Sequence, residues 1–195
     1  MKATSSDGSN NGTKKDEDGL GWTLVRASSD PYYTLTDKEG NKWTFNSGGR
    51  ITGIFNNQSY DKISFTYDST GYILQKIIDG AGHTLTFTRN QYNAILKITD
   101  GLGQSINFSY NGSKLVYITY PDGEIINLSY DCNSLINGVM LRDGRHVKYE
   151  YITTGNAVNK YRVKKVTEYS QADASGVRTS GNHTSLSYGN GNFTT

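Results

Sequence analysis

The chain repeats itself about every 21 residues, and this period constrains its fold more than any other feature. One column is apolar and recurs at spacings of 20 to 22 residues: Phe65, Phe87, Phe108, Leu128 and Tyr149. A second column follows two residues later: Tyr67, Arg89, Tyr110, Tyr130 and Tyr151. A third is an apolar pair three residues apart: Ile51/Ile54, Leu74/Ile77, Ile95/Ile98, Leu115/Ile118, Ile136/Val139 and Val163/Val166. A period of this length is typical of solenoids and arrays of stacked units.

Each unit begins with a run in which apolar and polar residues alternate, as in Ile63, Phe65 and Tyr67. Alternation with period two predicts a strand with one buried face. Polar turn residues such as Asn111-Gly112 then separate this run from the second apolar run, which predicts a β-hairpin. The first two columns, apart from Arg89, are therefore the predicted repeat core.

The apolar pair of each returning strand is spaced in a way that regular alternation does not explain. Residues three apart, such as Ile136 and Val139, would lie on opposite faces of a regular strand. We therefore predict a β-bulge or a strong local twist between them. The links between units, such as Asp79 to Gly82 and Asp143-Gly144, again have turn chemistry.

Composition agrees with a β-protein, since glycine (22) and tyrosine (15) are abundant among the 195 residues and no long window has helical periodicity. The predicted fold is all-β, a repetitive antiparallel β-hairpin meander that forms a curved open sheet of about six hairpins. If the Phe87 column is fully buried, replacing Phe87 with alanine should cost about 3 to 5 kcal/mol.

The sheet is predicted to cover residues 20–169, with a first strand at Leu20 to Leu24. Residues 1–19 are polar and predict a linker, and residues 170–183 predict a polar loop. Residues 184–195 predict the start of a further, truncated hairpin. We therefore expect a fragment of a larger protein, whose end strands can pair with another copy.

The repeat resembles the RHS or YD repeat family over roughly Tyr33 to Tyr169. Asp-Gly-x-Gly leads into an apolar-x-Phe-x-Tyr-Asp strand, and the Tyr-Asp pair is present as Tyr67-Asp68 and Tyr130-Asp131. Arg89 departs from the pattern, because the tyrosine is missing there.

The resemblance implies a spiralling strip of hairpins that forms the hollow shell of secreted polymorphic toxins, insecticidal toxin complexes or cell-surface adhesion proteins. In the toxins the shell encloses a C-terminal effector. The family's self-cleaving aspartyl protease has an Asp-Pro-x-Gly motif, whereas Asp30-Pro31 is followed here by Tyr32-Tyr33. Residues 1–19 lack the apolar segment of a signal peptide. An extracellular or wall-associated location in a bacterium is therefore implied by the resemblance alone.

No catalytic, metal or cofactor residues are predicted. His83 and His146 follow equivalent Asp-Gly turns, so the repeat explains their positions. The turn acids lack the ligand spacing of calcium loops, and Cys132 has no histidine near it in the sequence. No apolar run is long enough to span a membrane.

Two surface features leave a binding role open. Tyrosines outside the repeat column can stack on sugar rings, and these candidate glycan contacts are Tyr60, Tyr72, Tyr92, Tyr117 and Tyr120. A basic segment has seven positive residues against two acidic ones, and the candidate anion contacts are Arg142, Arg145, Lys148, Lys160, Arg162, Lys164 and Lys165. No nucleic-acid-binding motif accompanies them.

The sequence therefore predicts a non-enzymatic structural module of a β-hairpin shell. Its partners are the adjacent repeats of the parent polypeptide and an enclosed C-terminal effector. The alternative is a module that binds cell-surface carbohydrate or an anionic polymer.

Overall fold

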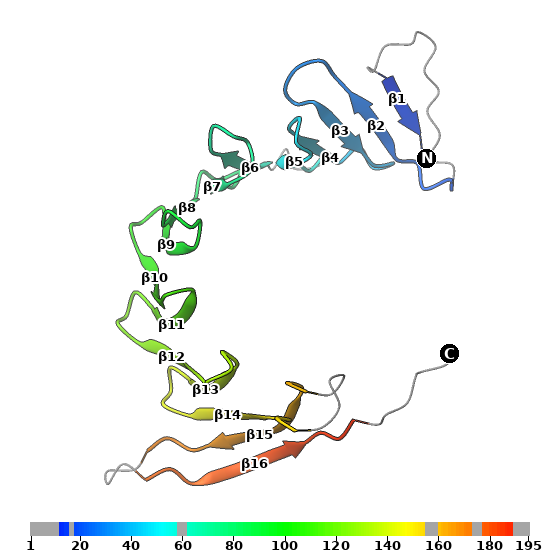
Figure 1. Ribbon diagram of the computed structural model, residues 1–195. Coiled ribbons are helices and arrows are strands. Elements are labelled where there is room, and N and C mark those ends of the chain that lie inside the picture. The colour runs from blue at the N-terminus through cyan, green and yellow to red at the C-terminus, as the bar shows by residue number, and fades with distance from the viewer. Residues whose placement is uncertain (1–11, 16–17, 58–61, 155–159, 173–176, 189–195) are drawn as a thin grey trace. The chain divides into compact units, whose positions relative to one another are not determined.

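The computed structural model describes residues 12–15, 18–57, 62–154, 160–172 and 177–188 (Figure 1). Regular secondary structure in these ranges consists of strands, with no helix. The chain divides into two compact units, residues 1–105 and residues 106–195, which are considered separately below.

The strands of the first unit are β1 (Gly12–Lys15), β2 (Thr23–Arg26), β3 (Tyr33–Thr36), β4 (Lys42–Phe45), β5 (Ile51–Phe55), β6 (Lys62–Tyr67), β7 (Leu74–Ile78), β8 (Thr84–Arg89) and β9 (Ile95–Asp100). Those of the second are β10 (Ser105–Asn111), which begins at the division, β11 (Lys114–Thr119), β12 (Ile125–Tyr130), β13 (Ile136–Met140), β14 (His146–Tyr151), β15 (Val163–Tyr169) and β16 (Ser180–Ser185).

The strand order follows the chain from β1 to β16. Within each unit the strands pair antiparallel with their neighbours in sequence, and short polar turns join β6 to β7 and each following strand to the next as far as β14. This arrangement confirms the predicted all-β meander of hairpins.

Two strands lie where the sequence predicted a linker and a loop. β1 falls within residues 1–19 and pairs with β2, and β16 begins at Ser180 and pairs with β15. Both strands are mostly polar, so they lack the apolar alternation that marks a strand in the sequence. Backbone hydrogen bonds to a neighbouring strand hold them, whatever their side chains.

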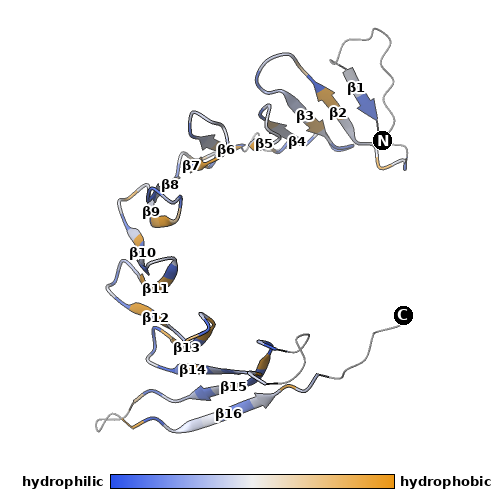
Figure 2. Cartoon of the chain, in the orientation of Figure 1, coloured by the Kyte–Doolittle hydropathy of each residue, from blue (hydrophilic) through white to orange (hydrophobic). Residues whose placement is uncertain are grey.

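One face of the sheet in each unit carries the apolar columns. In the first unit Ile54 of β5 lies opposite both Trp43 of β4 and Ile63 of β6, and Phe65 lies opposite Ile77. We call the face that carries these residues the ladder face. The opposite, polar face carries mainly threonine, serine and lysine, and Figure 2 shows the resulting recurrence of apolar residues along the strands.

No apolar side chain among the described residues is buried, because each unit is a single layer with no second sheet packed against it. The buried residues in this part of the chain are Gly53, Gly138 and Thr167. The predicted repeat core is thus a one-sided ladder of half-buried side chains: Phe65, Phe87, Phe108, Leu128, Tyr149, Tyr67, Tyr110, Tyr130 and Tyr151.

Four turns within the hairpins share one construction: β4–β5, β6–β7, β8–β9 and β12–β13. In the β6–β7 turn the amide of Gly71 donates to the carbonyl of Asp68 over 2.9 Å, and Gly71 has a φ of 77°. Asn93 and Ser134 occupy the same place in later turns, with φ of 65° and 66°. A left-handed backbone at this position explains the recurrence of glycine and asparagine.

The first residue of the turn fixes the turn with its side chain. The Asp68 carboxylate accepts hydrogen bonds from the Thr70 hydroxyl at 2.7 Å and from the Ile73 amide at 3.1 Å. These bonds outweigh the partial loss of solvation and lower the pKa of Asp68. Asn90 does the same with a neutral carboxamide, accepting from the amides of Tyr92 and Ala94.

The lowered pKa makes the turn sensitive to acid. A carboxyl whose pKa is lower in the folded state stabilises the fold above its unfolded pKa of about 4, and this contribution disappears as the pH falls through the folded value. Asp68→Asn keeps the acceptor oxygen and removes the charge. We expect the difference in urea midpoint between wild type and Asp68→Asn to be larger at pH 7 than at pH 3. A difference that does not change with pH would contradict this account.

The aromatic rings of the ladder face are only half-buried, so removing one should lower the free energy of unfolding less than removing a buried ring. Because Phe87 is half-buried, Phe87→Ala should lower the free energy of unfolding by about 1 to 2 kcal/mol, below the range for a fully buried ring. The matched control is Thr88→Ala on the polar face of the same strand, with an expected change below about 0.5 kcal/mol. Urea unfolding measures both. A loss above about 3 kcal/mol for Phe87→Ala would show that another layer covers the ladder face.

Candidate functional site

Every repeated hairpin contains a β-bulge at the same place. In six strand pairs the register shifts inside the returning strand, which has one residue more than its partner. The additional residue always lies inside the apolar pair: Thr52, Gln75, Leu96, Val116, Asn137 and Lys164. The predicted bulge is confirmed in every unit.

The bulge brings both members of the apolar pair to one face. In β13, Val139 lies opposite Leu128, and Ile136 lies opposite Tyr130. Leu128 and Tyr130 are two residues apart on a regular strand, so they point to the same face. The additional residue, Asn137, therefore keeps Ile136 on the ladder face.

Tyrosines of the second column donate hydrogen bonds to the bulge of the preceding hairpin. The Tyr67 hydroxyl lies 2.8 Å from the carbonyl oxygen of Ile51, and the Tyr130 hydroxyl lies 2.8 Å from that of Leu115. Tyr151 donates to Ile136 at 2.6 Å. In each case the acceptor is the residue just before the additional one. We call each of these contacts a tyrosine–bulge bond.

The column extends beyond the predicted sheet to Tyr188, whose hydroxyl lies 2.9 Å from the carbonyl oxygen of Val163. Burial raises the pKa of Tyr67 and of Tyr151, so both hydroxyls remain protonated donors near neutral pH. Each bond runs from one hairpin to the preceding one. It therefore joins neighbouring repeats by a side-chain contact, in addition to the backbone hydrogen bonds between their strands.

Arg89 occupies the tyrosine position of β8 and does not replace it chemically. Its Nη1 donates to the carbonyl of Asn93 over 3.0 Å, within its own hairpin turn. Its Nε is buried without a hydrogen-bond partner. An unpaired buried donor is destabilising, so this hairpin is a weak point of the array.

The turns are also joined from one hairpin to the next. The Asn46 carboxamide in the β4–β5 turn donates to the carbonyl of Gly71 in the β6–β7 turn at 2.9 Å. The Asn57 carboxamide after β5 donates to the carbonyl of Glu39 before β4 at 2.8 Å. These side chains lie outside the repeat columns, and the sequence pattern did not single them out.

The predicted glycan contacts are divided between the two units. Tyr72 and Tyr92 lie in two successive turns and are 59% and 81% exposed, whereas Tyr117 lies on strand β11 of the other unit. The guanidinium of Arg142 lies over the ring of Tyr120, with its central carbon 4.2 Å from the ring centroid. None of these four takes part in the ring–ring pairs of the described residues, Trp22–Trp43 and His146–Tyr169. Tyr60 lies outside the described residues.

The predicted anion contacts are partly paired already. Arg142 binds the carboxylates of Asp122 and Glu124 in the preceding turn, the latter at 2.9 Å. Arg145 binds Asp143 at 2.7 Å, and the Arg145 amide and side chain lower the pKa of that carboxyl.

The other predicted anion contacts are spread over several environments. Lys165 lies opposite Glu150, and Lys148 lies opposite Thr167. Arg162 and Lys160 lie over the rings of Tyr188 and Tyr161, and Lys164 is the additional residue of its bulge.

His83 and His146 belong to different units. His83 bonds Asp79 at 2.8 Å in a turn, and His146 packs on Tyr169 on the polar face. The described residues contain no group of three or more histidine, cysteine, aspartate or glutamate side chains arranged to hold a metal ion. No helix that could cross a membrane is found in the described part of the chain.

The family model described as the Teneurin YD-shell matches residues 29–190. The chain belongs to the Teneurin YD-shell family. This confirms the resemblance to RHS and YD repeats. Among curated proteins, no match is found.

Solved structures show a similar fold. The crystal structure of TcdB2-TccC3-TEV is similar at 13% identity with a TM-score of 0.53, over 82% of this chain and 10% of that one. The Photorhabdus luminescens Tc holotoxin pore is similar at 14% identity with a TM-score of 0.55, over 82% of this chain and 9% of that one. The chain therefore spans about a tenth of the length of the structures that it matches.

The tyrosine–bulge bonds of the YD-shell can be tested by removing one hydroxyl. Tyr130→Phe deletes the donor to Leu115 and keeps the ring, so we expect the free energy of unfolding to fall by about 1 kcal/mol. The matched control is Tyr117→Phe, which removes an exposed hydroxyl on the polar face and should change stability by less than about 0.3 kcal/mol. Equal effects of the two variants in urea unfolding would contradict a specific role for the bond.

The departure at Arg89 offers the reverse experiment. Arg89→Tyr restores the family residue, removes the buried unpaired Nε and supplies a hydroxyl toward the bulge of β7. We expect a gain of about 1 kcal/mol in the free energy of unfolding. Arg89→Phe removes the unpaired nitrogen without supplying a donor, so it should gain less than Arg89→Tyr. If both variants lower the thermal midpoint, the position is not a missing tyrosine–bulge bond.

Proposed function

We propose that this chain is a non-enzymatic structural module, a stretch of the β-hairpin shell of a larger protein. The observation that carries the proposal is the combination of a single-layer sheet with bonds between successive hairpins. With no buried apolar side chain in its described residues, the sheet depends on contacts between neighbouring repeats. Such a design suits a wall that extends by adding units.

The partners that we propose are the adjacent repeats of the parent polypeptide, together with a C-terminal effector enclosed by the shell. The similarity to about a tenth of the Tc holotoxin chain supports a place within a much longer protein. We also propose that the parent is a secreted bacterial protein, present outside the cell or at its wall. Several of the residues predicted to bind glycans or anionic polymers already have partners, such as Arg142 with Asp122, Glu124 and the Tyr120 ring, and this favours the scaffold over that alternative.

Loss of one contact in a scaffold of this kind should destabilise only the neighbouring strands. In a linear array each unit contacts only its neighbours, so a local change should have local effects. Tyr151→Phe removes the bond to Ile136 in β13. We expect faster amide hydrogen exchange in β13, β14 and β15, and unchanged exchange in β3 to β5. Tyr117→Phe serves again as the matched control.

Hydrogen exchange followed by mass spectrometry resolves these strands. If Tyr151→Phe raised exchange equally in every strand, the chain would unfold as one cooperative core. That result would contradict a shell built from nearest-neighbour units.

A further inference from the structure

Phe55 places an aromatic ring on the polar face of the first unit. In the strand register it lies directly opposite Lys42 of β4 on one side and Lys62 of β6 on the other. The Lys62 ammonium is 5.3 Å from the centroid of the Phe55 ring. Two lysines therefore lie opposite Phe55 in the strand register, and the ammonium of Lys62 lies over its ring, on a face that otherwise carries mainly small polar groups.

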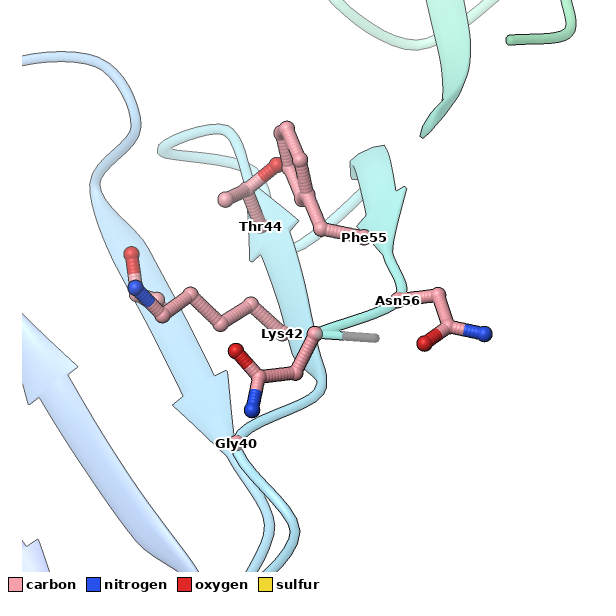
Figure 3. Close-up of a pocket in the computed structure, with 7 residues that line it drawn as sticks. Gly40, Lys42, Thr44, Phe55 and Asn56 are labelled. Carbon is pink, nitrogen blue, oxygen red and sulfur yellow. The ribbon is translucent and has the colours of Figure 1, made fainter. Parts of the chain in front are cut away.

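Gly53 gives the ring its position. A Cβ at Gly53 would lie 2.8 Å from the Phe55 ring and 2.8 Å from the Thr44 hydroxyl, closer than real contacts allow. The missing side chain leaves room for the ring to lean over β5 toward Thr44, and Figure 3 shows the two side chains next to each other.

Two hollows meet at this ring. The first, of about 400 Å³, is lined by Thr34, Lys42, Thr44, Phe55 and Asn57, with Gly40 at its edge. The second, of about 340 Å³, shares Thr44 and Phe55 and adds Lys62 and Asp30. Both belong to the first unit, and each has about the volume of a small-molecule site.

The chemistry of the lining selects the ligand. The ring supplies an apolar contact, threonine hydroxyls supply hydrogen bonds, and the ammonium groups attract a negative charge. The ion pairs recorded in the described part of the chain include neither Lys42 nor Lys62. A carboxylate on a hydroxylated ring would satisfy all three kinds of group.

An acidic peptide fits less well. Extended peptides bind sheets mainly by pairing with a free strand edge. Strands β4 and β5 are already paired on both sides, so no backbone groups are available beside the ring. A ligand here mainly meets side chains, which include threonine hydroxyls and lysine ammonium groups together with asparagine carboxamides and the Asp30 carboxylate.

We propose that the polar face around Phe55 is a binding site for a saccharide that carries a carboxylate, that is, a uronic acid. Its carboxylate lies at Lys42, its hydroxyls at the threonines, and its ring against Phe55. This site is distinct from the scattered tyrosines considered above, and it does not depend on the shell role of the chain.

The test is titration of the full chain with tri-galacturonic acid, followed by two-dimensional NMR. Because the site is open, we expect a dissociation constant of about 1 mM, with shifted amides in β4 and β5. Lys42→Gln should weaken binding about tenfold through loss of the charged hydrogen bond. The matched control, Lys76→Gln on the polar face of β7, should bind as wild type does. Phe55→Leu should weaken binding at least about fivefold while leaving the Lys42 region folded.

Three results would overturn the proposal. One is no saturable shift up to about 10 mM ligand. Another is equal weakening by Lys42→Gln and Lys76→Gln, which would indicate general charge attraction. The last is binding of neutral galactotriose, or of a triglutamate peptide, as tightly as the acidic sugar. The first result leaves the shell proposal untouched, since hydrogen exchange tests that separately.

Discussion

The β-bulge in each returning strand is the constraint on which the rest of the structure depends. Two residues that are three apart in a regular strand face opposite sides of the sheet, so an apolar pair with this spacing needs a bulge to face one side. With it, Ile136 and Val139 both join the ladder face. The bulge also disturbs the backbone hydrogen bonds locally. Beside it, a backbone carbonyl accepts a hydrogen bond from a tyrosine hydroxyl of the next hairpin. One irregularity thus accounts for both the ladder and the bond between repeats.

This mode of stabilisation differs from that of a globular domain. The ladder side chains are half-buried, so each unit gains only part of the hydrophobic stabilisation of a core residue. Specific polar contacts add to it: the tyrosine–bulge bonds, turn aspartates such as Asp68, and bonds between turns such as Asn46 to Gly71. Each of these is local or reaches only a neighbouring hairpin. A wall with this construction can be long without a thick interior.

Much of the fold could be predicted because equivalent positions of successive repeats carry similar residues, so the same pattern is seen several times. The columns, the hairpins and the bulge follow from spacing, and a single unit would not have shown them. The acceptors of the tyrosine hydroxyls could not be predicted, because a backbone carbonyl leaves no mark in the sequence.

The burial of the ladder was also beyond reach, since alternation shows that one face is apolar and does not say whether anything covers it. The polar strands β1 and β16 were missed for lack of alternation. The site at Phe55 could not be predicted either, because strand register is what places Lys42 and Lys62 opposite it.

Deleting the additional residue of one bulge tests the central claim most directly. Removal of Asn137 leaves Ile136 two residues before Val139, so a regular strand keeps both on the ladder face, and it removes the bulge beside the carbonyl that accepts the Tyr151 hydrogen bond. We predict that the deletion lowers the free energy of unfolding by about 1 kcal/mol, through loss of the Tyr151 hydrogen bond, while Asn137→Ala changes it by less than about 0.5 kcal/mol. Equal stability of the deletion and the alanine variant would show that the bulge is incidental to the repeat.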